Sequence, residues 1–411
     1  MTDVLIRPIT PDDDMDAQLD LGQRAFGIYS AAQRASWLTV ASLRAGQGMF
    51  LGAFVDGLPA GAAMLHDMRQ WWLGQAVPCA GIASVKVAPE HRGRGIGRRL
   101  MSAVLDTAAE RGYPLSALYP ATTPIYRSFG YELAGGKHEA AIPSRSLRGL
   151  IAPDVAPGPD GPVPSGGGAA DAVPIRRASQ EDAAAVIAIT GRAHELARDA
   201  GPITWDEGPT RQRLARQDTY SYLAGDDGFA AYRWADGSKE LFVERVHACT
   251  AESLRSLWSV IASHGSVAGT VRARIAPSDP FWWLTRERDA TLTKRSMWML
   301  RVVDAPAAIA ARGFPPAVSA DLALEIKDQS RPANSGSWQL TVAEGKGILT
   351  PNGPVSSSLP LTLGARGLGA LYAGTPLATL RLAGLAAGGT PHADAALDAA
   401  FAATPYMVDD Y

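Results

Sequence analysis

The spacing of apolar residues divides the first part of the chain into short strands and amphipathic helices. The clearest helix is predicted over 95–111, where Ile96, Leu100, Val104 and Ala108 recur on one face. Two more helices are predicted at Asp12–Phe26 and Thr123–Phe129. Strands are predicted between them at Val4–Ile9, Met49–Val55, Gly61–Leu65, Ile82–Val87 and Leu115–Tyr119. Strands that alternate with helices indicate an α/β domain.

This pattern stops at a segment that is rich in proline and glycine. Residues 152–174 contain almost no large apolar side chains, so they cannot contribute to a core. We therefore predict a first domain over residues 1–151 and an exposed linker over 152–173.

The pattern then begins again, which predicts a duplicated unit over 174–295. The segment V-P-I-R-R from Val173 resembles L-I-R-P-I from Leu5, and an acidic helix start follows each of them. Strands are predicted after it at Tyr220–Leu223, Phe229–Trp234 and Leu241–Val246, followed by a helix at Ala251–Ser263. The last block, 296–411, has few charges and frequent glycines, and we predict a small α+β domain.

Composition and charge narrow the class of protein. The 411 residues are 46% hydrophobic, which excludes a wholly disordered chain. With 39 basic and 41 acidic side chains the net charge is -2, so neither nucleic acid nor a membrane is an expected partner. The first residues do not resemble a signal peptide, and Cys79 and Cys249 are too few for a disulfide framework. We expect a cytoplasmic protein, and the seven histidines have no metal-binding spacing.

The most informative segment is V-K-V-A-P-E-H-R-G-R-G-I-G-R-R-L, from Val85 to Leu100. Pro89 ends the strand, and Arg92, Gly95 and Gly97 open the next helix in the pattern R-x-x-G-x-G. Glycine allows close approach of a ligand, and free N–H groups at a helix start bind anions. The dinucleotide and P-loop patterns are absent. The pattern favours a pyrophosphate site over a solvated turn.

This segment resembles the acetyl-CoA motif of the GCN5-related N-acetyltransferases (GNATs). The resemblance implies that the strand around Val85, Lys86 and Val87 binds the pantetheine arm of acetyl-CoA. It also implies that neighbouring strands separate beyond this point and leave a slot for the thioester. The pyrophosphate would then be bound by the turn residues Arg92, Gly93, Arg94, Gly95, Ile96, Gly97 and Arg98.

A second segment, Y-P-A-T-T-P-I-Y-R-S-F-G-Y from Tyr119 to Tyr131, resembles the I-Y-x-x-x-G-[FY] motif of the same family. The resemblance implies that Tyr126 stands near the thioester sulfur. A phenol with a pKa of about 10 is protonated at neutral pH and can donate a proton to the departing thiolate. The alternative is that Tyr126 is an ordinary core aromatic.

Nearly the whole chain resembles the enhanced intracellular survival (Eis) family of actinobacterial acetyltransferases. The matching segments include Y-R-S-F-G-Y and W-M-L-R-V-V-D-A-P-A-A-I-A-A-R-G. The resemblance implies tandem GNAT folds, each a mixed central sheet with flanking helices, followed by a sterol-carrier-protein-like domain. The second turn, Val246–Leu254, has no glycine and no arginine cluster, so the second copy is predicted not to bind the cofactor. Members of this family acetylate aminoglycosides, peptides and protein lysines, and they form hexamers.

The last residues are a candidate part of the active site. In the Eis family an acidic residue and a terminal aromatic reach this site, and Asp410 and Tyr411 match that pattern. The resemblance implies that the main-chain carboxylate of Tyr411 is the catalytic base and that Asp410 helps to bind the substrate. The alternative is a frayed terminus.

The predicted acceptor pocket is apolar. Family members that take polycationic drugs carry a carboxylate near the first helix, but the segment 24–30 has none here, and Ser84 replaces a usual aromatic. Phe26, Ile28 and Trp37 would line the pocket. We therefore predict transfer of acetyl from acetyl-CoA to a primary amine of a small molecule by direct attack. The alternatives are a protein lysine acetyltransferase and a non-catalytic lipid-binding protein with a vestigial GNAT domain.

Overall fold

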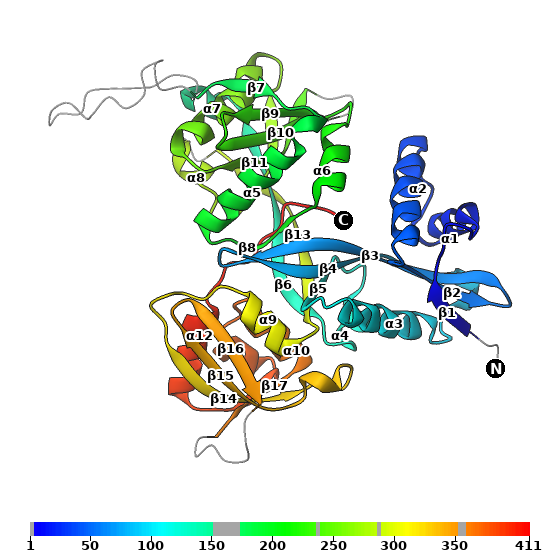
Figure 1. Ribbon diagram of the computed structural model, residues 1–411. Helices are drawn as coiled ribbons and strands as arrows, with labels where there is room; N and C mark the ends of the chain where they lie inside the picture. The colour runs from blue at the N-terminus through cyan, green and yellow to red at the C-terminus, as the bar shows by residue number, and fades with distance from the viewer. Residues whose placement is uncertain (1–3, 151–172, 236–238, 286–288, 352–358) are drawn as a thin grey trace.

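The computed structural model describes residues 4–150, 173–235, 239–285, 289–351 and 359–411. Apart from its last residue, the predicted linker at 152–173 lies outside these ranges. Within them, no helix combines the length and the apolar character that crossing a membrane requires. The chain forms two sheets, one large and shared by the first two blocks, and one small in the last block (Figure 1).

The first block contains all the predicted elements and two that the sequence analysis missed. The missed elements are helix α2, which has a Ser30–Gln33 capping box, and the long strand β6. In order, the elements are β1 (Val4–Pro8), α1 (Met15–Phe26), α2 (Ala31–Gly46), β2 (Phe50–Val55), β3 (Leu58–Trp72), β4 (Gln75–Val87), α3 (Ile96–Glu110), β5 (Leu115–Leu118), α4 (Thr123–Arg127) and β6 (Glu132–Pro143). Strands β3 and β4 are much longer than predicted.

The middle block repeats this order of elements, with one additional strand, β8, between its first two helices. It consists of β7 (Ile175–Arg177), α5 (Ala183–Ala197), β8 (Ala200–Thr204), α6 (Glu207–Leu214), β9 (Tyr220–Ala224), β10 (Gly228–Trp234), β11 (Glu240–Ala248), α7 (Ala251–Ala262), β12 (Thr270–Arg274), α8 (Phe281–Leu284) and β13 (Thr291–Val302). Strands β4 and β5 pair in parallel, and so do their counterparts β11 and β12.

The start of each block is also built in the same way. Arg7 binds Asp13 with both terminal nitrogens, at 2.8 and 2.7 Å, and the Asp13 carboxylate caps Thr10. Arg176 makes the same two contacts to Asp182, at 3.0 and 2.7 Å, and Asp182 caps Ser179. This shared geometry supports the duplication that the sequence predicts.

The two blocks exchange their last strands. Strand β13 pairs with β5 on one side and β6 on the other, and β6 continues alongside β12. The order in the large sheet is therefore β1-β2-β3-β4-β5-β13-β6-β12-β11-β10-β9-β7, with β8 paired to β3 (Figure 1). Because each final strand is hydrogen-bonded to the other block, the two blocks share one continuous backbone ladder.

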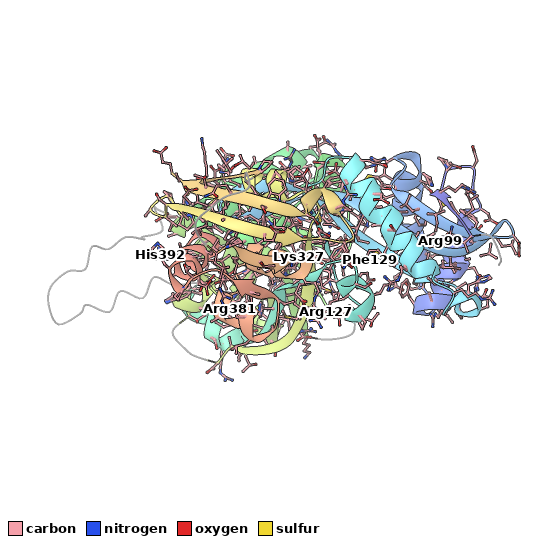
Figure 2. The ribbon with its side chains drawn as sticks, turned by 90° about the horizontal axis from the view of Figure 1, so that it is seen from below. Arg99, Arg127, Phe129, Lys327, Arg381 and His392 are labelled. Atoms are coloured by element: carbon pink, nitrogen blue, oxygen red, sulfur yellow. The ribbon has the colours of Figure 1, made fainter. Side chains whose placement is uncertain are left out.

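The last block packs against this ladder. It contains α9 (Ala305–Ala311), β14 (Ala320–Lys327), β15 (Gly336–Ala343), β16 (Lys346–Pro351), β17 (Leu361–Gly364), α10 (Ala365–Tyr372), α11 (Leu377–Leu382), β18 (Ala386–Gly388) and α12 (Pro391–Phe401). Its sheet has the order β16-β15-β14-β17-β18. Strand β13 runs across position 296, where the sequence analysis began this domain. A groove lined by Arg127 and Lys327 marks its border with the first block (Figure 2).

A buried ion pair joins the last block to the large sheet. Arg301 on β13 binds both carboxylate oxygens of Asp328, at 2.7 and 2.5 Å, and both side chains are fully buried. Asn334 donates a further hydrogen bond to Asp328, at 3.0 Å. Removing one member of such a pair leaves an uncompensated charge in a medium of low dielectric constant.

We therefore predict that Asp328→Ala lowers the free energy of unfolding by about 3–5 kcal/mol. The control is Asp106→Ala, which removes an exposed partner of Arg331 and should cost less than about 1 kcal/mol. Urea denaturation measures both values. Equal effects of the two substitutions would contradict a structural role for the buried pair.

Candidate active site

A pocket opens where β4 turns into α3. Its volume is about 420 Å³, and one wall is formed by the turn residues Arg92, Gly93, Gly95, Ile96, Gly97 and Arg98. The other wall is formed by residues of α4 and its end, including Ile125 and Ser128. Of the predicted turn residues, Arg94 is exposed and does not line the pocket.

The backbone of this turn requires its glycines. Gly93 and Gly95 both have φ of +77°, a region that other residues rarely adopt. Gly95 caps α3 and accepts a hydrogen bond from the Arg99 N–H. The N–H groups of Ile96, Gly97 and Arg98 therefore precede the first bond within the helix and are available to an anion.

The ladder between β4 and β5 stops several residues before the turn. The parallel pairing ends at Ile82 and Leu118, while β4 continues to Val87. A bulge lies in the same stretch, because Ser84 and Val85 together occupy one position of the ladder with β3. Ser84 has φ of +53°, so the backbone kinks there. The main chain of β4 from Ala83 to Val87 is therefore not paired with β5.

The side chain of Lys86 does not face this pocket. Successive residues of a strand point to opposite faces, so Lys86 points away from the side of Val87, which lines the pocket. Its Nζ donates a hydrogen bond to the Gln18 carbonyl at 2.9 Å and lies 4.7 Å from the centre of the Trp37 ring. Burial lowers the pKa of Lys86 to about 8. A cofactor role could therefore involve only the main chain of this residue.

Tyr126 lies on α4, with its side chain 7% exposed. Its ring meets that of Tyr131 edge-on at 6.2 Å, within the core cluster that includes Leu118 and Phe129. Burial raises the pKa of the Tyr126 phenol, so the hydroxyl is protonated at neutral pH. This geometry suits both a core aromatic and a proton donor.

The segment 405–411 leaves the last block and ends between the first two (Figure 1). The Tyr406 N–H binds the Ala200 carbonyl, and the Met407 N–H binds the Gly136 carbonyl. Two glycines make room for it: a Cβ on Gly135 would lie 2.5 Å from the Pro405 oxygen, and one on Gly201 would lie 2.4 Å from the Tyr406 oxygen. This segment is therefore packed, and the frayed alternative is wrong.

Charged side chains from both blocks hold the end of this segment. Arg245 of β11 binds the Asp409 carboxylate at 2.6 Å, and Tyr119 donates to the Asp409 main-chain oxygen at 2.9 Å. Asp410 is paired with Arg274, at 2.7 Å, and with Lys137. The carboxylate that was predicted to bind substrate thus anchors the chain. The sequence analysis missed these partners because they are distant in the chain.

Tyr411 occupies an aromatic enclosure that the sequence analysis did not identify. Its ring lies 6.3 Å from His66, 5.6 Å from Tyr119 and 6.2 Å from Trp205, measured between ring centres. A Cβ on Gly81 of β4 would lie 3.0 Å from the Tyr411 ring, so the two are in close contact. Burial lowers the pKa of His66 to about 3, so its imidazole is neutral.

The predicted acceptor residues do not form one cluster. Phe26 and Ile28 lie at the loop between α1 and α2, and their exposed fractions are 53% and 92%. Trp37 lies deeper, edge-on to Phe50, and its Nε1 is buried without a hydrogen-bond acceptor. The structure therefore groups Trp37 with Lys86 and leaves Phe26 and Ile28 on the surface.

Residues 5–134 and 196–302 each match a family model for an acetyltransferase (GNAT) domain, and residues 305–408 match one for a sterol carrier protein domain. The GCN5-related N-acetyltransferase from Kribbella flavida is 42% identical and superposes with a TM-score of 0.90, covering 100% of this chain and 99% of its own. The one from Anabaena variabilis is 28% identical, with a TM-score of 0.84 and full coverage of both chains.

These matches define the class of protein, a tandem GNAT acetyltransferase with a sterol-carrier-like domain. N-acetyltransferase Eis of Mycobacterium tuberculosis is 28% identical over 386 residues, which are 91% of this chain and 90% of that protein. The chain belongs to this Eis type of N-acetyltransferase, as its sequence indicates. Enzymes of this class use acetyl-CoA as a co-substrate and an amine as acceptor.

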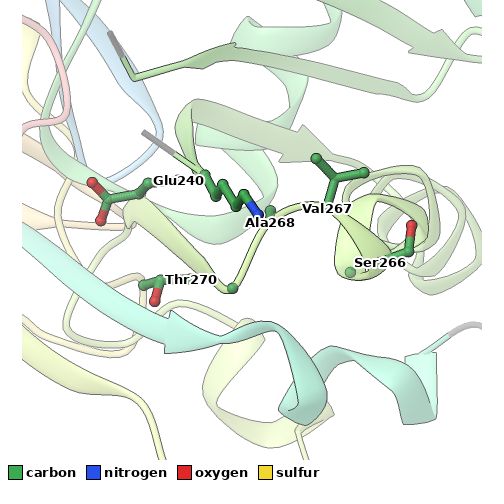
Figure 3. A pocket seen from close by; sticks show the side chains of 8 residues that line it. Glu240, Ser266, Val267, Ala268 and Thr270 are labelled. Carbon is green, nitrogen blue, oxygen red and sulfur yellow. The ribbon is translucent and has the colours of Figure 1, made fainter. Parts of the chain in front are cut away.

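Two further findings bear on the site. Among the residues that the structure describes, no group of three or more His, Cys, Asp or Glu side chains could hold a metal ion. Another hollow lies in the middle block, at residues 239–240 and 265–270 (Figure 3). None of the predicted site residues lines it.

Proposed function

We propose that this enzyme transfers the acetyl group of acetyl-CoA directly to a primary amine of a small molecule, in a ternary complex. One observation carries this proposal: the glycine turn and Tyr411 lie at the two ends of one stretch of β4, from Gly81 to Val87. Strand β5 pairs with this stretch only as far as Ile82, which leaves the main chain from Ala83 to Val87 free of β5.

In this proposal, the chain binds acetyl-CoA through its backbone. The N–H groups at the start of α3 bind the pyrophosphate, and Arg92 and Arg98 add positive charge. The main chain of β4 at Val85, Lys86 and Val87 binds the pantetheine arm. The thioester then reaches the bulge at Ser84, where main-chain amides can polarise its carbonyl.

In the proposed reaction, Tyr126 is the proton donor and the main-chain carboxylate of Tyr411 is the proton acceptor. The amine nitrogen attacks the carbonyl carbon, the carbon–sulfur bond breaks, and Tyr126 donates its proton to the sulfur. Its raised pKa keeps this proton in place until the thiolate forms. The main-chain carboxylate of Tyr411 accepts the proton that the new amide loses, directly or through a water. The anchors at Asp409 and Asp410 hold Tyr411 for this role.

The acceptor that we propose is apolar or aromatic. Trp37 offers an aromatic wall, and the cationic Lys86 beside it repels polycations. Asp410, the acidic residue next to Tyr411, is already paired with two cations. An aryl-alkylamine therefore fits the site better than an aminoglycoside does.

The first test is thiol release from acetyl-CoA with a panel of amines. We expect aryl-alkylamines to be turned over faster than kanamycin, since only the latter brings several positive charges to Lys86. Equal rates would contradict the apolar pocket. Activity on protein lysines alone, or no activity together with copurifying lipid, would favour the two alternative functions.

The second test compares two glycines at helix ends. Gly95→Ala should weaken CoA binding by about ten-fold or more, because the strained residue moves the anion-binding turn. Gly112→Ala is the matched control, since Gly112 has φ of +75°, has equally open surroundings and lies at the other end of α3. Isothermal titration calorimetry with CoA measures both affinities, and an equal loss in both variants would argue against a pyrophosphate site.

The third test concerns the carboxylate of Tyr411. Adding a tag after this residue converts its carboxylate to an amide and keeps its ring, so the tag should lower kcat by about ten-fold or more and leave the KM for acetyl-CoA unchanged. Deleting the residue also removes the ring that contacts Gly81, so the deletion should lower kcat at least as much. The same tag at the N-terminus serves as the control. Unchanged rates in the tagged and truncated enzymes would remove this carboxylate from the mechanism.

A further inference from the structure

The first block has a bulge in β4 and a glycine turn after it, and of these two features the middle block has only the bulge. Only Cys249 and Thr250 separate β11 from α7, so there is no room for an anion-binding turn. The bulge remains, because Ala231 pairs with Arg245 and Tyr232 with Val243, which leaves Glu244 as the extra residue. This bulge corresponds to the one at Ser84 in the first block.

A cavity lies beside this second bulge, under α5 and α6. Its volume, measured as the space open to the centre of a water molecule, is about 40 Å³, which is enough for more than one water. Its lining is mainly apolar, with side chains such as Leu214 and Phe229. The polar lining includes Arg213, Thr219, Arg245 and one carboxylate, Glu244.

Arg213 carries an unpaired charge in this cavity. Its Nη1 is buried and has no hydrogen-bond acceptor, and among the described residues no carboxylate forms an ion pair with it. Its guanidinium lies 4.5 Å from the centre of the Trp205 ring. Burial is the main cause that lowers the pKa of Arg213 to about 10, and the positive charge of Arg245 lowers this pKa further.

The carboxylates nearest to Arg213 are occupied by other cations. Asp409 is bound to Arg245 at 2.6 Å, and Glu244 lies 3.3 Å from Arg216 and 3.5 Å from Arg233. Trp205 lines the same cavity, and its Nε1 is also buried without an acceptor. The cavity therefore has one excess positive charge and at least two hydrogen-bond donors without partners.

We propose that this cavity is a binding site for a single carboxylate group, held by Arg213. The planar guanidinium matches a carboxylate in shape and charge. One unpaired cation balances one negative charge, so a monocarboxylate fits better than a phosphate dianion. The apolar walls suit a short aliphatic group attached to the carboxylate.

The site adjoins the proposed active site. Trp205, one wall of the cavity, also contacts the ring of Tyr411, and Arg245, another wall, holds Asp409. The carboxylate could belong to the amine acceptor itself or to a free small acid. The first case rests on the proposed function, whereas binding of a carboxylate does not.

The test uses the full-length protein, with sodium butyrate as the probe and sodium chloride at equal ionic strength as the reference. We expect butyrate to raise the Tm by about 2 °C or more at saturation and to change tryptophan fluorescence, because binding acts on the folded state beside Trp205. Arg213→Met should abolish both effects. Arg211→Met, on the exposed face of the same helix, should retain them.

A stability measurement separates this proposal from a structural role of Arg213. Removing this unpaired charge also removes its contact with the Trp205 ring, so the Tm of the ligand-free Arg213→Met variant should fall by no more than about 2 °C. A larger fall would show that a carboxylate pairs with Arg213 in the free protein and would overturn the proposal. The proposal would also be overturned if butyrate had no effect on the wild type, or if its effect on Arg213→Met were equally large.

Inhibition kinetics with an active amine then distinguish the two sources of the carboxylate. Butyrate that competes with the amine indicates the acceptor's own carboxylate, and butyrate that does not compete indicates a free acid. The inhibition kinetics concern only where the carboxylate comes from. If the enzyme transfers no acetyl group, the proposed function is wrong, but the butyrate-binding experiment still tests the carboxylate site on its own.

Discussion

The exchange of strands β6 and β13 is the constraint on which the rest of the structure depends. Each strand completes the sheet of the other block, so the two blocks cannot separate without breaking a long run of backbone hydrogen bonds. The same strand β13 carries Arg301, which binds the last block through Asp328. One strand therefore sets the position of all three parts.

This fixed arrangement makes it possible to build a site from distant segments. The end of the chain can lie against Gly81 only because Ala200 and Gly136, from different blocks, are held side by side to bind it. Arg245, Arg274 and Lys137 then neutralise the side-chain carboxylates of Asp409 and Asp410. The second GNAT copy thus contributes directly to the binding of this segment, through Ala200, Arg245 and Arg274.

Local patterns were sufficient for much of the fold and for part of the site. The glycine turn, the helix α3 and the duplicated start of each block follow from spacing and side-chain type. The long strand β6 was missed because its glycines and charges, at Gly135, Gly136 and Lys137, do not alternate like an amphipathic strand. Gly135 is needed for close contact with the C-terminal segment, which no local pattern reveals.

The sequence by itself determined the class of enzyme, the three-part layout and the glycine turn that opens α3, because these depend on residues that are close together in the chain. Only the tertiary structure decided which side chains share the enclosure of Tyr411, which face of β4 carries Lys86, and which arginine is left without a partner. The physical reason is the same in each case. Burial and charge pairing depend on contacts between remote segments, and the strand exchange establishes those contacts.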